Sequence, residues 1–211
     1  MLPVYFFVNN MSSSLGFVVV FLKEIFVRVI TTELPGVYLI EPTVFNDVRG
    51  FFIESYNSAA LAEQGIHYKF IQDNHAKSDP VGVLRGLHFQ LPPKAQAKLV
   101  RVTAGAVYDV IVDLRVGSPT FRRWSSFKLT SDNFRQLLIP KGFAHGYMTL
   151  AEHTEFLYKV DEYYDPKNDA GIIWNDFDLN IDWPITKPVL SIKDQALPHL
   201  RNFQSPFVFK G

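Results

Sequence analysis

From residue 27 onward the chain shows short apolar and β-branched runs separated by Gly, Pro, Asn and Asp. Residues 36–45 (GVYLIEPTVF) alternate and end in the turn signal NDVRG, and 51–57 (FFIESYN) predict the next strand. Residues 68–78 (YKFIQDNHAKS) predict a strand that runs into a polar loop. Residues 155–166 (EFLYKVDEYYDP) predict a further strand that ends at an Asp-Pro pair.

The strongest hairpin pattern covers residues 98–118 (KLVRVTAGAVYDVIVDLRVGS). Two valine-rich runs flank the Ala-Gly pair at 104–105, and the second run alternates through Val107, Asp109 and Ile111. Two alternating runs joined by so short a connection predict an antiparallel hairpin.

Helical patterns are few and short. Residues 58–65 (SAALAEQG) predict a brief helix with serine at its cap and glycine at its end, and a second helix is expected near 191–197 (SIKDQAL). Residues 122–150 add two more strands with Ser-Asp-Asn between them, whereas 172–184 are loop-rich. Many closely spaced strands with almost no long helical period predict an all-β domain, an antiparallel β-sandwich or jelly roll with a few short helices.

The N-terminal residues 1–25 differ from the rest of the chain in their hydropathy. They are strongly apolar, but their uninterrupted apolar runs are far shorter than the roughly 20 residues needed to span a bilayer. No Lys or Arg precedes Lys23, which disfavours a secretory signal. We expect this segment to be an extra strand or an upstream extension from a misplaced start, and residues 26–211 to form a single domain.

Composition narrows the classes of function. Lys plus Arg (21) equals Asp plus Glu (21), so no global positive field favours nucleic acid or a membrane surface. The chain has no cysteine, which excludes disulfides, thiolate metal sites and cysteine nucleophiles and suits the cytoplasm.

Polar residues inside apolar strands carry the chemical information, because a buried polar group without a partner costs a few kcal/mol. Arg85 and His88 lie three residues apart, which on a regular strand points them to opposite faces. A kink at Gly86, between them, would let both side chains reach one cavity. The polar residues of this kind are Arg49, Glu54, Gln72, Asn74, Arg85, His88, Lys98, His145 and Tyr158.

A metal centre is one reading of the histidines. Residues 139–146 (IPKGFAHG) have the Pro, Gly and His spacing of the second cupin motif, so the sandwich is expected to be cupin-like. A usual cupin metal set also needs a His-x-His pair, and here the candidate reads His88-Phe-Gln. His75, His88 and His145 could converge on a metal, but we favour a site without one. Walker, Rossmann and GxSxG motifs are absent.

Several motifs together resemble one known family. RGFFIESYN, QDNHAKS, LRGLHFQ, QAKLVRV, SPTF, IPKGFAHG, EFLYKVDEYYDP and LSIKD follow one another as they do in dTDP-4-dehydrorhamnose 3,5-epimerases, from about residue 26 to the C-terminus. The resemblance implies a cofactor-free and metal-free homodimer that inverts C3 and C5 of dTDP-4-dehydro-6-deoxy-D-glucose. The product would be dTDP-4-dehydro-L-rhamnose, in dTDP-L-rhamnose biosynthesis.

The same resemblance implies a role for each candidate residue. His88 would be the base, Asp194 its partner, Tyr158 the acid on the opposite face, and Lys98 the cation that stabilises the enolate oxygen. Substrate-binding roles fall to Arg49, Glu54, Gln72, Asp73, Asn74, Arg85, Lys98, His145, Tyr164 and Asp169, with the arginines on the diphosphate, Tyr164 stacked on thymine, and Arg49 and Glu54 reaching the partner's site.

Two departures and three alternatives accompany the resemblance. Asp169 stands where the family often has glutamate, and Phe89 replaces a commoner tyrosine. One alternative is an enzyme that inverts only C3 or acts on another dTDP-4-keto sugar. The others are a non-catalytic cupin that binds sugar nucleotides and a metal-dependent cupin oxygenase or isomerase. The presence of both His88 and Tyr158 favours double epimerisation.

Overall fold

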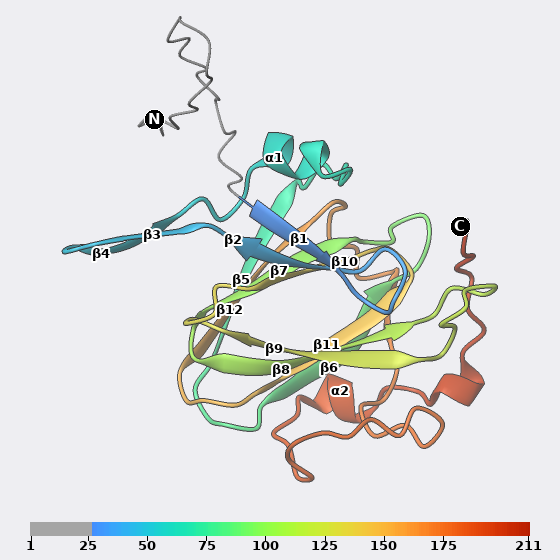
Figure 1. Ribbon diagram of the computed structural model, residues 1–211. Helices are drawn as coiled ribbons and strands as arrows, with labels where there is room; N and C mark the ends of the chain where they lie inside the picture. Colours follow the sequence, from blue (N-terminus) through green and yellow to red (C-terminus); the bar gives the residue numbers. More distant parts are fainter. Residues whose placement is uncertain (1–26) are drawn as a thin grey trace, which may run out of the picture.

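The computed structural model describes residues 27–211 and consists of two antiparallel sheets packed face to face (Figure 1). The expectations for residues 1–25 therefore lie outside the described residues. The predicted all-β sandwich is confirmed, and the sheets do not close into a barrel. The six-stranded sheet contains, in spatial order, β1 (Val27–Thr31), β2 (Tyr38–Pro42), β10 (Gln136–Ile139), β7 (Lys98–Ala104), β12 (Thr154–Val160) and β5 (Gln72–Ser78).

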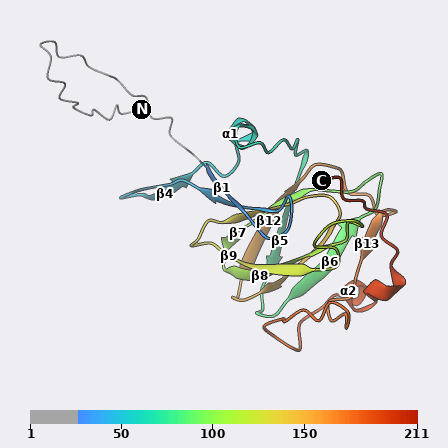
Figure 2. The ribbon, with the colours of Figure 1, turned by 45° about the vertical axis from the view of Figure 1, so that its right-hand side comes forward.

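The second sheet has five strands and lies below the first in Figure 1. A separate two-stranded hairpin projects from the sandwich in both Figure 1 and Figure 2. The five-stranded sheet runs β13 (Asp169–Gly171), β6 (Leu84–Gln90), β11 (Phe143–Thr149), β8 (Ala106–Asp113) and β9 (Trp124–Thr130), and the hairpin is β3 (Val44–Asp47) with β4 (Gly50–Ile53).

Three apolar clusters follow from this layering. The first lies between the two sheets and includes Val100, Ile111 and Phe156, each at most 1% exposed. The second packs the outer face of the five-stranded sheet against residues 172–207. The third covers part of the outer face of the six-stranded sheet with α1 (Ser58–Glu63) and its neighbours. The C-terminal segment is thus held on one sheet, and it carries α2 (Ile192–Gln195) and the short helix Leu200–Asn202.

The predicted hairpin at 98–118 is wrong. β7 pairs with β10 and β12, whereas β8 pairs with β9 and β11, so the chain crosses from one sheet to the other at Gly105. Gly105 has φ +75°, and a Cβ there would lie 2.4 Å from the Thr154 Oγ1 atom. Alternation shows which side chains of a strand face inward, but it does not show which strand lies next to it.

Three local predictions also need correction. Residues 36–45 form two strands, β2 and β3, rather than one. In 68–78 the polar half is the strand itself, β5, because an edge strand beside a polar cavity needs no apolar face. The first helix is capped by Asn57, not by the serine after it, since the Asn57 carboxamide accepts hydrogen bonds from two backbone N–H groups. The short helix near 191–197 and the loops of 172–184 are confirmed.

The kink expected at Gly86 is present. His88 pairs with His145 and Arg85 with Tyr147, so three steps along β6 match two steps along β11. Gly86 has φ +140°, and a Cβ on it would lie 2.5 Å from the Gly146 Cα atom. This bulge restores the parity of β6, so Arg85 and His88 line the same cavity.

Candidate active site

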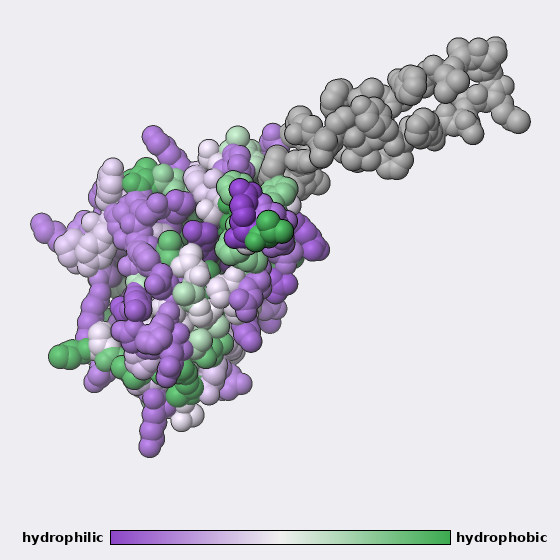
Figure 3. Space-filling model, turned by 90° about the vertical axis from the view of Figure 1, so that its left-hand side faces the viewer, coloured by the Kyte–Doolittle hydropathy of each residue, from purple (hydrophilic) through white to green (hydrophobic). Residues whose placement is uncertain are grey.

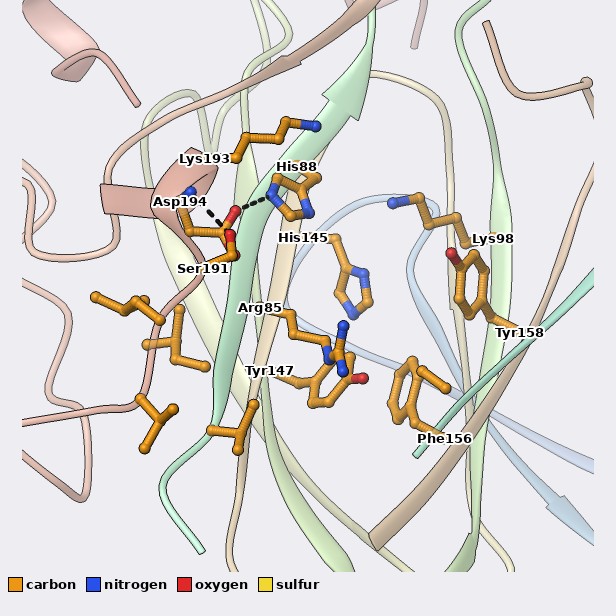
Figure 4. Close-up of a pocket in the computed structure, with 15 residues that line it drawn as sticks. Arg85, His88, Lys98, His145, Tyr147, Phe156, Tyr158, Ser191, Lys193 and Asp194 are labelled. Atoms are coloured by element: carbon orange, nitrogen blue, oxygen red, sulfur yellow. Dashed lines mark hydrogen bonds and ion pairs between the residues drawn. The ribbon is translucent and has the colours of Figure 1, made fainter. Parts of the chain in front are cut away.

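A cavity of about 400 Å³ opens between the two sheets and the C-terminal segment (Figure 4). It contains six of the predicted residues. They come from β6 and β11 of the five-stranded sheet, from β7 and β12 of the six-stranded sheet, and from α2. These six are Arg85, His88, Lys98, His145, Tyr158 and Asp194, and the other lining residues are Ala76, Val83, Leu84, Tyr147, Phe156, Val189, Leu190, Ser191 and Lys193.

The shortest polar contact in the cavity joins His88 to Asp194. The distance from His88 Nε2 to Asp194 Oδ1 is 2.5 Å, and Asp194 is only 3% exposed. Ser191 caps α2, with its hydroxyl oxygen accepting the Asp194 backbone N–H at 3.1 Å. Burial is the largest single influence and raises the pKa of the Asp194 carboxyl group, but the hydrogen bond and charge of His88, with the contacts of Ser191 and Lys193, together outweigh it and lower the pKa. Asp194 is therefore a carboxylate at neutral pH.

That carboxylate fixes the state of the histidine. A carboxylate only accepts hydrogen bonds, so His88 Nε2 carries the proton and Nδ1 is left with a free lone pair. Figure 4 shows Nδ1 on the cavity side of the ring. Asp194 also stabilises the imidazolium that would form if Nδ1 took up a proton. The pair can therefore act as a base at the wall formed by the five-stranded sheet.

Tyr158 lies on the opposite wall, in β12 of the six-stranded sheet. Burial raises the pKa of Tyr158, although the nearby Arg85 acts against this. Its hydroxyl is thus protonated at neutral pH and can donate a proton. The Lys98 Nζ atom lies 6.0 Å from the centroid of the Tyr158 ring, in the neighbouring strand β7.

Lys98 and a second His–Asp pair occupy the middle of the cavity. Burial lowers the pKa of Lys98 to about 8, against the attraction of Asp109 and Asp169. The His145 Nε2 atom lies 3.0 Å and 3.1 Å from the two carboxylate oxygens of Asp109, which is fully buried. Burial lowers the pKa of His145 and raises that of Asp109. His145 is therefore a neutral donor held in place by Asp109.

Tyr164 and Asp169 lie at the rim of the cavity rather than inside it. The Tyr164 hydroxyl donates to Asp169 Oδ2 at 3.0 Å, and Lys193 forms an ion pair with the same carboxylate. Gln72 joins this group by accepting the Tyr164 backbone N–H at 3.1 Å. Asp169 is thus already engaged by a cation and a phenol next to the dyad.

Asp73 and Asn74 do not line the cavity. The Asp73 carboxylate pairs with Lys159 at 2.8 Å and 3.0 Å, and Asn74 accepts from the Gln72 side chain at 2.9 Å. Both border a separate recess of about 180 Å³, which also includes Arg101.

Arg49 and Glu54 also lie outside the cavity. Arg49 is exposed at the turn of the β3–β4 hairpin and forms an ion pair with Asp47. Glu54 follows β4 and accepts a hydrogen bond from Asn57 at 2.8 Å. Within one chain these two residues belong to no common site with His88.

The histidines do not form a metal site within residues 27–211. No group of three or more His, Asp or Glu side chains in this range could hold a metal ion. His88 and His145 each bond to a carboxylate, and His75 lies exposed, 3.2 Å from Glu155. In the same range, no helix is long and apolar enough to span a membrane.

Sequence reasoning missed three lining or supporting residues. Asp109 could have been found from the sequence. It alternates with Val107 and Ile111, which face inward, and a charged side chain at an inward-facing position indicates a functional site. Lys193 stood in the LSIKD motif next to Asp194. Tyr147 gave no signal, because a tyrosine in an apolar strand normally serves packing; here it stacks on Phe156, with ring centroids 4.0 Å apart.

Comparisons with known proteins identify one family. Residues 31–202 match the family model described as dTDP-4-dehydrorhamnose 3,5-epimerase. The curated dTDP-4-dehydrorhamnose 3,5-epimerase of Pseudomonas aeruginosa is 53% identical over 164 residues, which cover 77% of this chain and 90% of that protein.

Two solved structures are similar over most of their length. The dTDP-4-dehydrorhamnose 3,5-epimerase of Bacillus anthracis, with TDP and PPi bound, is 55% identical with a TM-score of 0.81 and covers 82% of this chain and 99% of its own. The dTDP-6-deoxy-D-glucose-3,5-epimerase of Legionella pneumophila, in complex with dTDP-4-keto-L-rhamnose, is 42% identical with a TM-score of 0.82 and covers 87% and 99%. By its sequence and its fold, this chain belongs to the dTDP-4-dehydrorhamnose 3,5-epimerase family of isomerases.

Proposed function

We propose that this chain inverts C3 and C5 of dTDP-4-dehydro-6-deoxy-D-glucose and so makes dTDP-4-dehydro-L-rhamnose. One observation carries the proposal: the His88–Asp194 pair and Tyr158 face one cavity from different sheets. An inversion needs a base on one face of the ring and an acid on the other, and a sandwich of two sheets supplies two opposite walls.

The C4 ketone makes the reaction possible without a cofactor. Both C3 and C5 are adjacent to that carbonyl, so their C–H bonds are acidified. His88 Nδ1 takes the proton, the electron pair forms an enolate with its charge on O4, and Tyr158 delivers a proton to the other face. Afterwards His88 releases its proton to solvent and Tyr158 is reprotonated, and the cycle repeats at the second carbon.

Lys98 acts on the charge that develops during this step. An ammonium group in a site sheltered from water stabilises a developing oxyanion far more than it does in bulk water. His145, neutral and held by Asp109, binds the sugar beside Lys98. Because the Nε2–H of His145 donates to Asp109, its Nδ1 lone pair can accept a hydrogen bond from a sugar hydroxyl, while Lys98 stabilises the enolate.

The nucleotide lies along the rim. Arg85 holds the diphosphate, and Tyr164 stacks on thymine with Gln72 and Asp169 beside it. Asp73 and Asn74 border the separate recess beside β5, so their part in nucleotide binding stays a prediction. We place the reaction in the cytoplasm, because sugar nucleotides occur there and a chain without cysteine suits that reducing compartment.

A second copy of the chain completes the site. The β3–β4 hairpin extends away from the sandwich and exposes Val48, Phe51 and Phe52 by 105%, 58% and 68%. Figure 3 views the molecule from the side of this hairpin, with hydrophilic and apolar groups together at its tip. Apolar side chains on a projecting arm mark an interaction surface. In a symmetric dimer each arm would carry Arg49 and Glu54 to the partner's cavity.

Proton NMR of the substrate in deuterium oxide tests the reaction. The intact enzyme should place deuterium at both C3 and C5, whereas His88→Asn should reduce exchange by at least about a hundredfold, because general-base catalysis contributes on that order. Label at C3 alone would identify a 3-epimerase. Folded protein that binds the sugar nucleotide but exchanges neither position would contradict the proposal.

Lys98→Met separates catalysis from stability. Turnover should fall by about a hundredfold or more with little change in dTDP affinity. The folded-state pKa of about 8 lies below the ordinary lysine value of 10.5, so the charged form destabilises the fold at pH 7. The variant should therefore be more stable at pH 7, by on the order of 2 kcal/mol after allowing for solvent in the cavity, and this gain should disappear as pH rises from about 8 to 10.5. Urea unfolding at pH 7 and pH 10 measures it, and reduced stability at pH 7 would be contrary evidence.

Mixed dimers test whether Arg49 acts across the interface. Arg49→Ala and His88→Asn should each be strongly impaired alone. Co-expressed, they should recover about a quarter of wild-type activity, because half of the dimers are mixed and each mixed dimer has one intact site. If Arg49 served its own chain, no activity would return, and gel filtration of the wild type would then decide whether a dimer exists.

A further inference from the structure

Tyr147 lines the cavity with a hydroxyl group that has no hydrogen-bond partner among residues 27–211. The residue is 5% exposed, and its hydroxyl oxygen is buried from solvent. The ring stacks on Phe156, with centroids 4.0 Å apart and an angle of 19° between the planes, and a phenylalanine at this position would stack as well. Because an unpaired buried hydroxyl is unfavourable, packing alone does not explain a tyrosine here.

Arg85 is the residue opposite Tyr147 in the sheet. The two pair across β6 and β11, and both line the cavity beside the bulge at Gly86. Figure 4 shows the Arg85 guanidinium beside the Tyr147 ring. Burial raises the pKa of Tyr147 to about 12, and the positive charge of Arg85 acts against this. Ser78 is a smaller influence in the same direction as Arg85, but neither side chain has the geometry of a hydrogen bond to the Tyr147 hydroxyl.

The present hydrogen bonds of Arg85 are long. Its Nε atom donates to Ser78 Oγ at 3.4 Å, and its Nη2 atom donates to the Lys77 carbonyl at 3.3 Å, both on the edge strand β5. Ordinary distances from an N–H nitrogen to an oxygen are about 2.7–3.2 Å. Arg85 is also exposed to solvent. Its guanidinium can therefore turn from β5 toward the cavity without breaking a strong contact.

We propose, resting on the assignment of Arg85 to the substrate diphosphate, that the Tyr147 hydroxyl oxygen accepts an N–H of Arg85 when the diphosphate binds. A guanidinium has five N–H donors in one plane, so it can bond to Tyr147 along one edge and to phosphoryl oxygens along another. The stacked ring fixes the position of the oxygen, and the oxygen fixes the guanidinium over the cavity. Tyr147 is then a positioning residue, which acts on the substrate through Arg85.

Tyr147→Phe removes the oxygen and keeps the ring. By calorimetry its affinity for dTDP should fall on the order of tenfold, the size expected for one hydrogen bond to a charged group. Its affinity for thymidine, which carries no phosphate, should stay the same. Urea unfolding of the ligand-free variant should show no loss of stability, because the hydroxyl has no partner to lose within residues 27–211. A residue with only a structural role would show the opposite pattern.

Two further variants serve as controls. Arg85→Met removes the donor, so adding Tyr147→Phe to it should change the affinity for dTDP by less than about twofold. Tyr108→Phe removes the same atom from a tyrosine outside the cavity, in β8 and packed against Trp183. This variant should bind dTDP like the wild type.

Equal affinity of the wild type and Tyr147→Phe for dTDP would overturn the inference. A loss of about tenfold on top of Arg85→Met would also overturn it, because Tyr147 would then act without Arg85. A crystal structure of the dTDP complex is a direct second test. It should show Arg85 donating to the Tyr147 oxygen, and a guanidinium out of hydrogen-bond range of that oxygen would contradict the proposal.

The two proposals can fail separately. dTDP is not turned over, so its affinity does not depend on epimerase activity. Missing deuterium exchange would contradict the proposed function, whereas intact exchange with no coupling between Tyr147 and Arg85 would contradict only the role of Tyr147.

Discussion

The hydrogen bond of 2.5 Å between His88 and Asp194 joins the C-terminal segment to β6 of the five-stranded sheet. Asp194 comes from α2, and His88 from β6, so this contact links residues far apart in the chain. A buried carboxylate that lost this partner would destabilise the fold by several kcal/mol. The same contact fixes the histidine tautomer, closes one side of the cavity and places the parallel β-bridge of Val83 and Val189 beside it. Catalytic geometry therefore depends on a contact that also helps the apolar cluster to hold the C-terminal segment on the sheet.

The second constraint is the packing of two sheets around polar groups. A sandwich normally fills the space between its sheets with apolar side chains, as Val100, Ile111 and Phe156 do here. Around the cavity, Lys98 and Asp109 replace such side chains. Burial lowers the pKa of Lys98 and raises that of Asp109, which favours the neutral form of each side chain. Both pKa shifts indicate that burying these charged groups lowers the stability of the fold. The site keeps them because it needs charged and proton-transferring groups sheltered from water.

The sequence predicts the composition of the site better than the arrangement of the strands. Alternation indicated the all-β class, and polar residues within apolar strands indicated His88, Lys98, His145 and Tyr158, which meet in one cavity. It failed at residues 98–118, because a hairpin and a crossing between two sheets have the same pattern of alternation and the same glycine. Asp109 was overlooked in that segment, although its parity places it inside.

Other features of the site depend on how the strands pair or on a second chain. Gly86 signalled a kink, and only the pairing of β6 with β11 shows that the bulge brings Arg85 and His88 to one side. Arg49 and Glu54 lie away from the cavity, so their predicted roles depend on a partner. Asp73 faces a separate recess, where a bound nucleotide or a second chain would decide its contacts.

In the proposed mechanism, His88 and Tyr158 act on opposite faces of the sugar ring. Tyr158→Phe keeps the base and removes the acid, and NMR in deuterium oxide can follow both label and configuration in the recovered sugar. We expect deuterium in substrate of unchanged configuration, returned by His88 to the face from which the proton left, with inversion slowed by about a hundredfold or more. Inversion at the wild-type rate in this variant would show that the proton comes from elsewhere and would contradict the account.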